Sequence, residues 1–99
     1  MKFSERVLQL TAQIPKGKVS TYKELARAAG NSKAARAAGN ALNSNPVPVK
    51  VPCHRIVCSD GKLGGYAFGV KKKIALLQKE GLRVKDGNVL DFERMLFNF

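Results

Sequence analysis

Proline and glycine interrupt a helical pattern at defined points in the first half of the chain, and these interruptions restrict how it can fold. Four apolar residues recur at helical spacing: Phe3, Val7, Leu10 and Ile14. Ser4 is a possible N-cap, and Pro15 followed by Gly17 supplies a stop. The spacing predicts a first helix over about residues 4–14.

A second helix is predicted after a brief extended segment, Val19–Ser20. Residues 21–24 form a capping-box pattern, in which the Thr21 oxygen and the Glu24 carboxylate can each satisfy a free backbone N–H. The helix is expected over about residues 22–29, and it ends at Gly30.

A third helix is predicted over about residues 33–43, with Asn31 or Ser32 as its cap. The short joint at Gly30 makes the second and third helices a helix-turn-helix candidate, with the third as the DNA-reading element. Small residues dominate this third helix: Ala34, Ala35, Ala37, Ala38, Gly39 and Ala41. A thin helix can approach a DNA groove closely, and it equally suits tight packing between helices.

The middle of the chain reads as loops and short strands. Residues 43–48 form a loop pattern, and an extended run leads into Pro52. Three valines alternate in that run: Val47, Val49 and Val51. A small β-hairpin is expected between residues 56–58 and a short partner after the turn at residues 59–62.

A glycine-rich loop over residues 63–69 precedes a fourth helix, which Gly81 closes at the C′ position with Leu82 beyond it. Apolar spacing supports that helix: Val70, Ile74 and Leu77. The tail, residues 83–99, is too apolar for a disordered end and is expected to fold back. The chain is thus predicted to be one domain over residues 1–99, mainly α, a winged-helix-like helix-turn-helix fold with a small β-hairpin.

Charge favours a polyanionic partner. Eighteen basic residues against seven acidic ones give a net charge of +11, and such an excess suits nucleic acid. The alternative is a basic, well-solvated surface without a partner. No stretch is apolar enough to span a membrane or serve as a secretory signal, so we expect a soluble, cytoplasmic protein without a membrane partner.

The two cysteines, Cys53 and Cys58, are too few and too close together for a secreted disulfide framework, so reduced thiols are expected. With His54 they lack the paired spacing of zinc ligands, and we expect no metal and no cofactor. Cys53 lies between a proline and a histidine, which is a composition typical of an activated thiol. Adjacent side chains seldom face one another in extended backbone, so proton transfer to His54 would need a water or a local helical turn.

The segment Pro52-Cys53-His54-Arg55, preceded by Asn45-Pro46-Val47-Pro48, resembles the active-site signature of the O6-alkylguanine-DNA alkyltransferases. Four further blocks look like that family's blocks, in order and with compatible spacing: Val19–Tyr22, Asn31–Ala37, Gly64–Tyr66 and Leu76–Gly81. Together they cover roughly residues 4–82.

The resemblance implies that Cys53 accepts the alkyl group, that His54 is the water-mediated base, and that Glu80 orients His54. It also implies that Tyr22 helps rotate the damaged nucleotide out of the stack and hydrogen-bonds the purine. Without the resemblance, Glu80 would read as a solvated helix-end residue and Tyr22 as a half-buried aromatic.

For DNA binding, the resemblance implies that Arg36 occupies the vacated stack; unaided, Arg36 would read as a phosphate contact. Small residues of the third helix and a neighbouring lysine would approach the DNA: Lys33, Ala35, Ala37 and Gly39. Asn45 would bridge the recognition helix to the active-site loop, and Tyr66 would close over the flipped base. Relatives often carry serine where this chain has Ala67, so one hydrogen bond to the lesion oxygen is expected to be absent or to come from backbone.

Lys71, Lys72 and Lys73 lie in the first turn of the fourth helix, where cations oppose the helix dipole. We interpret them as a solvated basic face, with phosphate contact as the alternative.

The function expected from the resemblance is single-turnover repair of alkylated guanine in double-stranded DNA by a monomer, because a thioether on Cys53 is not readily cleaved. Family members usually carry an N-terminal domain, which this architecture is expected to lack. The alternative is an alkyltransferase-like lesion sensor that recruits other repair factors, although those proteins replace the acceptor cysteine. A third possibility, a sequence-specific helix-turn-helix regulator, leaves Cys53, His54 and Glu80 unexplained.

Overall fold

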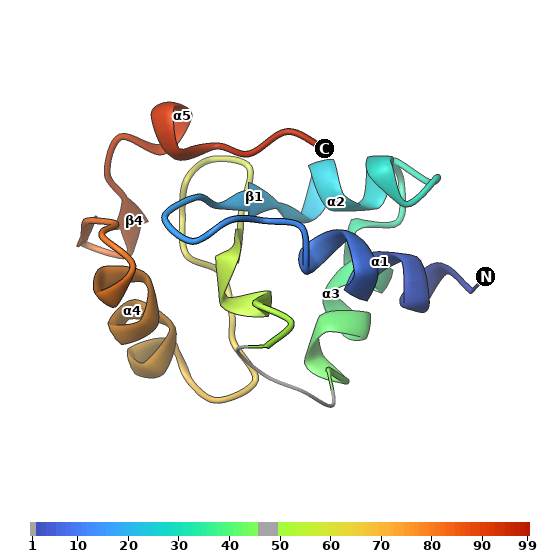
Figure 1. The fold of residues 1–99 in the computed structure, drawn as a ribbon, viewed down its shortest axis with the longest axis horizontal. Coiled ribbons are helices and arrows are strands. Elements are labelled where there is room, and N and C mark those ends of the chain that lie inside the picture. Colours follow the sequence, from blue (N-terminus) through green and yellow to red (C-terminus); the bar gives the residue numbers. More distant parts are fainter. Residues whose placement is uncertain (1, 46–49) are drawn as a thin grey trace.

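Three helices, α1 to α3, gather at one end of the molecule, and α4 lies at the other end with a small hairpin (Figure 1). The computed structural model describes residues 2–45 and 50–99. In chain order the elements are α1 (Phe3–Thr11), β1 (Ser20–Thr21), α2 (Tyr22–Ala28), α3 (Ala35–Asn43), the 3-10 turn η1 (Cys53–Arg55), β2 (Ile56–Val57), α4 (Val70–Lys79), β3 (Val84–Lys85), β4 (Asn88–Val89) and α5 (Phe92–Met95). The predicted fold class, a mainly helical helix-turn-helix protein with small sheets, is confirmed.

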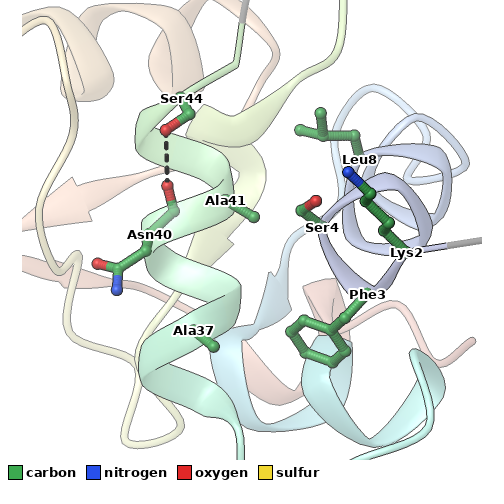
Figure 2. Close-up of a pocket in the computed structure, with 8 residues that line it drawn as sticks. All are labelled: Lys2, Phe3, Ser4, Leu8, Ala37, Asn40, Ala41 and Ser44. Carbon is green, nitrogen blue, oxygen red and sulfur yellow. Dashed lines mark hydrogen bonds between the residues drawn. The ribbon is translucent and has the colours of Figure 1, made fainter.

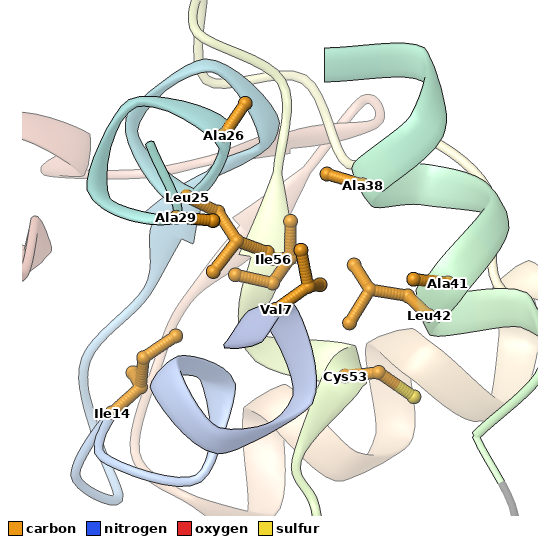
Figure 3. Close-up of a cluster of buried hydrophobic side chains, with 10 residues drawn as sticks. All are labelled: Val7, Ile14, Leu25, Ala26, Ala29, Ala38, Ala41, Leu42, Cys53 and Ile56. Carbon is orange, nitrogen blue, oxygen red and sulfur yellow. The ribbon is translucent and has the colours of Figure 1, made fainter. Parts of the chain in front are cut away.

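The first hydrophobic core lies among α1, α2 and α3 and also contains Cys53 (Figure 3). Val7, Leu25 and Ile56 are fully buried in it. From α3, Ala38 is 0% and Ala41 is 7% exposed, so these two small residues serve close helix packing. The rest of the small-residue surface of α3 remains available to solvent or to a ligand.

The helix starts differ from two of the sequence predictions. Lys2, not Ser4, is the N-cap residue of α1, and its side chain makes no capping bond. At α2 the Thr21 hydroxyl accepts from the Glu24 N–H at 3.0 Å, as predicted. The other predicted bond of the capping box, in which the Glu24 carboxylate accepts from a free backbone N–H, is wrong. That carboxylate instead pairs with Arg27, one turn along the helix.

Helix lengths also differ at the ends of α1 and α3. α1 stops at Thr11, because the residues up to Ile14 form tighter bonds of the 3-10 type, although Ile14 remains buried. The Asn31 side chain does accept a backbone N–H, that of Lys33 at 3.1 Å, but this bond closes a turn and α3 begins later, at Ala35.

The β-pairing corrects the predicted hairpin. Residues 56–58 do not pair with the segment after residues 59–62 as a two-stranded hairpin; β2 instead runs parallel to β1, with Ser20 opposite Ile56 and Thr21 opposite Val57. Both β2 side chains are fully buried, which is typical of a parallel strand covered on both faces. The small antiparallel hairpin lies later in the chain, between β3 and β4.

The tail folds back, as predicted from its apolar residues. Val19 donates to the carbonyl of Met95 at 2.9 Å, and Phe97 donates to the carbonyl of Val19 at 2.7 Å, so the tail extends the edge of β1. Val89 joins a second buried cluster with Val57 and Leu77. The tail therefore supports the same short sheet that carries the site residues.

The end of α4 is fixed by a glycine in left-handed conformation, as predicted. Gly81 has φ 93°, its N–H donates to the carbonyl of Gln78, and the N–H of the buried Leu82 donates to Leu77. These two bonds form a Schellman motif. They hold Glu80, the C-cap residue, in one orientation at the end of the helix.

An open groove lies along one side of the contact between α1 and α3 (Figure 2). Phe3 and Leu8 line it from α1, and Ala37 and Ala41 line it from α3. Ala37 therefore faces α1 across this groove.

The predicted loop over residues 43–48 and the alternation of Val47 and Val49 fall largely outside the described residues. Within residues 2–45 and 50–99, no helix has both the length and the apolar composition that a bilayer crossing requires.

The cap at α2 predicts a measurable difference between Thr21 and Ser4. Thr21→Val keeps the shape of the side chain but removes the oxygen that accepts the Glu24 N–H, so it should lower the free energy of unfolding by about 1 kcal/mol. Ser4→Ala, at the exposed position first expected to cap α1, should change it by less than about 0.5 kcal/mol. Urea unfolding of both variants measures this, and equal losses would contradict the assignment.

Candidate active site

Cys53 opens the 3-10 turn η1 at the edge of the first core and is 6% exposed. The Asn45 side-chain amide donates to the carbonyl of Val51 at 2.8 Å and lies 3.6 Å from the Cys53 sulfur. Asn45 follows α3, so one side chain connects the end of the proposed recognition helix with the backbone before the thiol.

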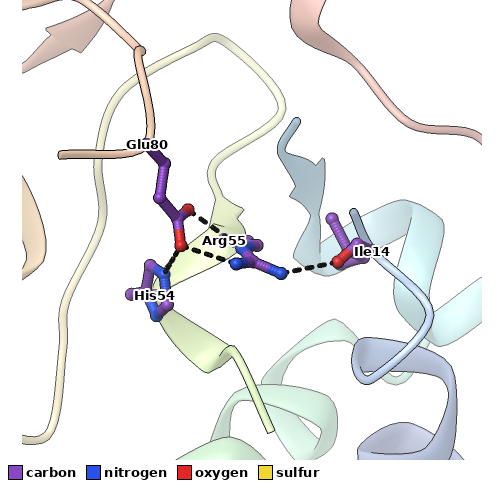
Figure 4. A network of polar contacts seen from close by, with 4 residues as sticks. All are labelled: Ile14, His54, Arg55 and Glu80. Carbon is purple, nitrogen blue, oxygen red and sulfur yellow. Dashed lines mark hydrogen bonds and ion pairs between the residues drawn. The ribbon is translucent and has the colours of Figure 1, made fainter. Parts of the chain in front are cut away.

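His54, the next residue of η1, is fully buried, and its Nε2 lies 3.1 Å from Oε2 of Glu80 (Figure 4). A carboxylate only accepts, so Nε2 carries the proton and Nδ1 of the neutral ring is the unprotonated nitrogen. Nδ1 is buried and hydrogen-bonds no described protein group. The ring therefore presents a free acceptor, which a general base requires.

Arg55 completes the turn and binds the same carboxylate with two nitrogens. Its Nε donates to Oε1 of Glu80 at 2.9 Å and its Nη2 to Oε2 at 2.5 Å, while Nη1 donates to the carbonyl of Ile14 at 2.8 Å (Figure 4). Glu80 thus joins the active-site turn to α4, and Arg55 joins both to the chain beyond α1.

These contacts set the protonation of the pair. Burial lowers the pKa of His54 below its ordinary value; Glu80 opposes that change, and the charges of Arg55 and Lys73 add to it. Burial alone would raise the pKa of Glu80, but the hydrogen bonds from Arg55 and His54 lower it overall. At neutral pH the site therefore holds an ionised Glu80 and a neutral His54.

Tyr22 begins α2, directly after β1, and its hydroxyl donates to the carbonyl of Gly65 at 3.4 Å. Burial raises the pKa of Tyr22 to about 12, and the charges of Cys58 and Cys53 contribute. Gly64 has φ 70°, and a Cβ there would lie 3.2 Å from the Tyr22 ring. A side chain at Gly64 would crowd the phenol and would need a backbone conformation that L residues rarely adopt, so glycine suits this close approach.

Lys73 is fully buried, so its interpretation as part of a solvated basic face is wrong. Its ammonium donates to three carbonyls, those of Ile56 at 2.7 Å, Leu63 at 2.5 Å and Gly65 at 3.0 Å. The three bonds satisfy all three donors of the ammonium group. Lys73 therefore ties the glycine loop to β2, whereas Lys71 and Lys72 are exposed as expected.

Tyr66 lies in the loop before α4, with its ring edge-on to His54 at a centroid distance of 6.5 Å. Its hydroxyl is buried without a hydrogen-bond partner among the described residues. Ala67, next to it, is exposed. The Tyr66 hydroxyl and Nδ1 of His54 are thus two unsatisfied polar atoms on neighbouring rings.

A second groove runs from Tyr22 to α3 and contains several residues predicted to contact DNA. Its lining consists of Tyr22, Ala35, Arg36, Gly39, Asn40, Asn43 and Gly65. Arg36 is exposed at this groove, and Lys33 is exposed in the turn before α3. Ala37 is separated from the set, because it lines the groove on the α1 side.

Sequence reasoning missed the positions of Arg55 and Lys73. Arg55 is part of the Pro-Cys-His-Arg segment, so the sequence places it two residues after the thiol. The sequence does not show that its partner is the Glu80 carboxylate. Lys73 precedes Leu77 by four residues, which places it on the buried face of α4. In the described part of the chain, no three His, Cys, Asp or Glu side chains gather as a metal site requires.

Comparison with known families matches residues 2–82 to the profile described as "6-O-methylguanine DNA methyltransferase, DNA binding domain". The human methylated-DNA--protein-cysteine methyltransferase is 48% identical over 83 residues, which are 83% of this chain and 40% of that protein. A bifunctional methyltransferase/endonuclease of Picrophilus torridus is 44% identical over 89 residues, 90% of this chain and 30% of that protein. The chain spans less than half the length of these curated relatives.

Two solved structures relate the fold to DNA complexes. Mycobacterium tuberculosis OGT in complex with DNA has a TM-score of 0.79 and 42% identity, covering 82% of this chain and 49% of that one. S. pombe Atl1 in complex with damaged DNA containing O6-carboxymethylguanine has a TM-score of 0.87 and 28% identity, and covers both chains completely.

Buried Lys73 predicts a pH-dependent contribution to stability. Burial lowers the pKa of Lys73 from 10.5 to about 8, so between these values the unfolded chain binds the proton and the folded chain does not. The free energy of unfolding should therefore rise with pH across this window, by up to about 3 kcal/mol from this group. Denaturant unfolding at several pH values should show that rise reduced in Lys73→Met and retained in Lys71→Met. If the difference in free energy of unfolding between the wild-type protein and Lys73→Met did not change with pH, the assigned pKa shift of Lys73 would be contradicted.

Proposed function

Because the chain belongs to the 6-O-methylguanine DNA methyltransferase family, we propose that it repairs DNA by taking the alkyl group of an O6-alkylguanine irreversibly onto Cys53. The observation that carries this proposal is the arrangement at η1. A buried thiol is contacted by the Asn45 amide, and it is followed by a neutral histidine bound to an ionised carboxylate. A structural or DNA-reading role alone would not require that arrangement.

The proposed step is a direct displacement at the alkyl carbon. Nδ1 of His54 takes up the thiol proton through a water, and the sulfur of Cys53 attacks the carbon. The S–C bond forms as the O6–C bond breaks, and the electron pair of the broken bond remains on O6 of the purine. The imidazolium then releases the proton through water and the purine anion takes up one proton, so the products are an S-alkylcysteine, an intact guanine and a neutral His54. The thioether is stable, and each molecule would act once.

Tyr22 would stabilise the leaving purine by donating a hydrogen bond. With its pKa raised to about 12, the phenol stays protonated at neutral pH and can donate throughout the reaction. Its present acceptor, the carbonyl of Gly65, is 3.4 Å away, so an incoming base would displace only a long bond. Tyr66 brings a buried hydroxyl that a flipped base can satisfy.

The groove between Tyr22 and α3 would receive the DNA strand. Its lining includes the small residues Ala35 and Gly39, which allow the backbone of α3 to approach closely. Arg36 and Lys33 are exposed beside it, and the net charge of +11 favours a polyanion. The complexes of M. tuberculosis OGT with DNA and of Atl1 with damaged DNA support an interface of this kind. We propose residues 1–99 as one domain that both binds DNA and carries the acceptor.

A second candidate function is recognition of the lesion without transfer. The likeness to Atl1 over the full length of both chains favours it. The presence of Cys53 with its histidine and carboxylate favours transfer.

Mass spectrometry after mixing with O6-methylguanine duplex separates the two functions. The wild-type protein should gain the mass of one CH2 unit on the peptide that contains Cys53, and Cys53→Ala should gain none while still binding the duplex. Cys58→Ala is the matched control and should gain the same mass as wild type. Binding without any gain by the wild type would favour the lesion sensor.

Arg36 is tested by separating its charge from its planar shape. If the guanidinium fills the vacated stack, both Arg36→Ala and Arg36→Lys should slow transfer from duplex DNA much more than from single-stranded DNA, because a lysine cannot stack. Single-turnover rates on the two substrates measure this. Full activity of Arg36→Lys on duplex would identify Arg36 as a phosphate contact instead.

A further inference from the structure

Two N–H donors, one from His54 and one from Arg55, bind the same oxygen of Glu80. Oε2 receives His54 Nε2 at 3.1 Å and Arg55 Nη2 at 2.5 Å, while Oε1 receives Arg55 Nε. The carboxylate is 9% exposed and the arginine side chain 14%, so solvent screens these contacts little. Arginine remains charged at every relevant pH. Arg55 therefore neutralises most of the negative charge of Glu80. The attraction of that carboxylate for a proton on His54 is weaker than it would be without the arginine.

We propose that Arg55 is a positioning residue that shares Glu80 with His54, so that the imidazole is held in one orientation yet stays neutral and keeps an unprotonated Nδ1. This inference rests on the proposed alkyl transfer, in which His54 accepts the thiol proton. It assigns a specific task to the arginine of the Pro-Cys-His-Arg segment, which the transfer step itself does not use.

The need for such a residue follows from the charges around the ring. A buried His54 paired with Glu80 alone would gain a proton readily, since the pair would become a salt bridge. A protonated ring has no free acceptor and cannot take the thiol proton. With Arg55 present, protonation would leave the buried triad with a net positive charge beside the Lys73 ammonium, which also opposes it.

The remaining groups near the ring do not replace Arg55. Tyr66 contacts the imidazole edge-on, and its phenol is uncharged at neutral pH. Cys53 precedes His54 in the same turn, and as a thiolate it would favour protonation of the ring. Lys73 directs its three donors to the carbonyls of Ile56, Leu63 and Gly65. Arg55 alone, among the described residues, binds both oxygens of Glu80.

Anchoring is the second part of the task. The third nitrogen of Arg55, Nη1, donates to the carbonyl of Ile14, just beyond α1. Ile14 is 1% exposed and belongs to the first core, so the guanidinium is held from both sides. The orientation of Glu80, and through it of the imidazole, is thus tied to the helical core as well as to α4.

His54 is the only histidine of the chain, so its titration can be followed directly by NMR without DNA. In Arg55→Met the Glu80–His54 pair remains, and the titration midpoint should rise above the ordinary histidine value of about 6.5. In Arg55→Lys the charge remains, and the midpoint should stay below it. In the double variant Arg55→Met, Glu80→Gln no carboxylate remains to favour protonation, and the midpoint should again lie below about 6.5.

A merely structural role gives a different pattern. If loss of Arg55 only loosened the site, the midpoints of Arg55→Met and of the double variant would both approach about 6.5, the value of a solvated imidazole. That result would overturn the proposal, as would an unchanged midpoint in Arg55→Met. Thermal unfolding of each variant establishes whether it is folded. If Arg55→Met does not fold, the midpoint of Arg55→Lys can still be compared with that of the wild-type protein.

Transfer kinetics provide the second readout. In a plot of transfer rate against pH, the acid limb should shift to higher pH in Arg55→Met, by the same amount as the titration midpoint of His54. A midpoint higher by about one pH unit would slow transfer about tenfold below the limb, where the rate follows the fraction of unprotonated imidazole. A downward movement of the limb would mean that the protonated ring is the active form and would overturn the proposal. Absence of transfer in the wild-type protein would refute the proposed function and leave the NMR result interpretable by itself.

Discussion

The parallel pairing of β1 with β2 is the contact on which the candidate site depends. It places Ser20 opposite Ile56 and Thr21 opposite Val57, so α2 begins level with Cys58, where β2 ends, and η1 ends level with Val19, where β1 begins. Tyr22 follows one strand and the Cys53–Arg55 turn precedes the other. Two strands of two residues are too short to be stable alone. They persist because both are buried between the two hydrophobic clusters and because the tail bonds to Val19 on the outer edge.

Buried charges connect this sheet to α4. Lys73 binds three backbone carbonyls, and Glu80 binds both Arg55 and His54. Each group would be costly to bury without partners, so the contacts define one arrangement of loop, turn and helix more strictly than apolar packing would. The same contacts leave the Tyr66 hydroxyl and Nδ1 of His54 unsatisfied, and these are the groups that face the proposed chemistry.

Local patterns predicted the helices well and the sheet poorly. The Thr21 cap, the Gly81 stop and the apolar spacing of α1 and α4 depend on residues within a few positions of one another, and all appear in the structure. The hairpin assigned to residues 56–58 was wrong because the partner of β2 lies far away in the sequence, at β1. Lys73 was misassigned because its three carbonyl acceptors come from two separate segments, which no local pattern identifies.

The order of the helices and the likeness to a family that repairs alkylated guanine could be predicted from the amino-acid sequence. So could the candidate site residues Cys53, His54, Glu80, Tyr22 and Arg36. Short-range hydrogen bonding, apolar periodicity and an ordered set of motifs were sufficient for that. The folded arrangement was needed to show which groups share the Glu80 carboxylate, that Lys73 is buried, and that Ala37 faces a different groove from Arg36. The physical reason is that ionisation and accessibility depend on distances between segments remote in the chain, and burial multiplies the effect of those distances by removing the screening of water.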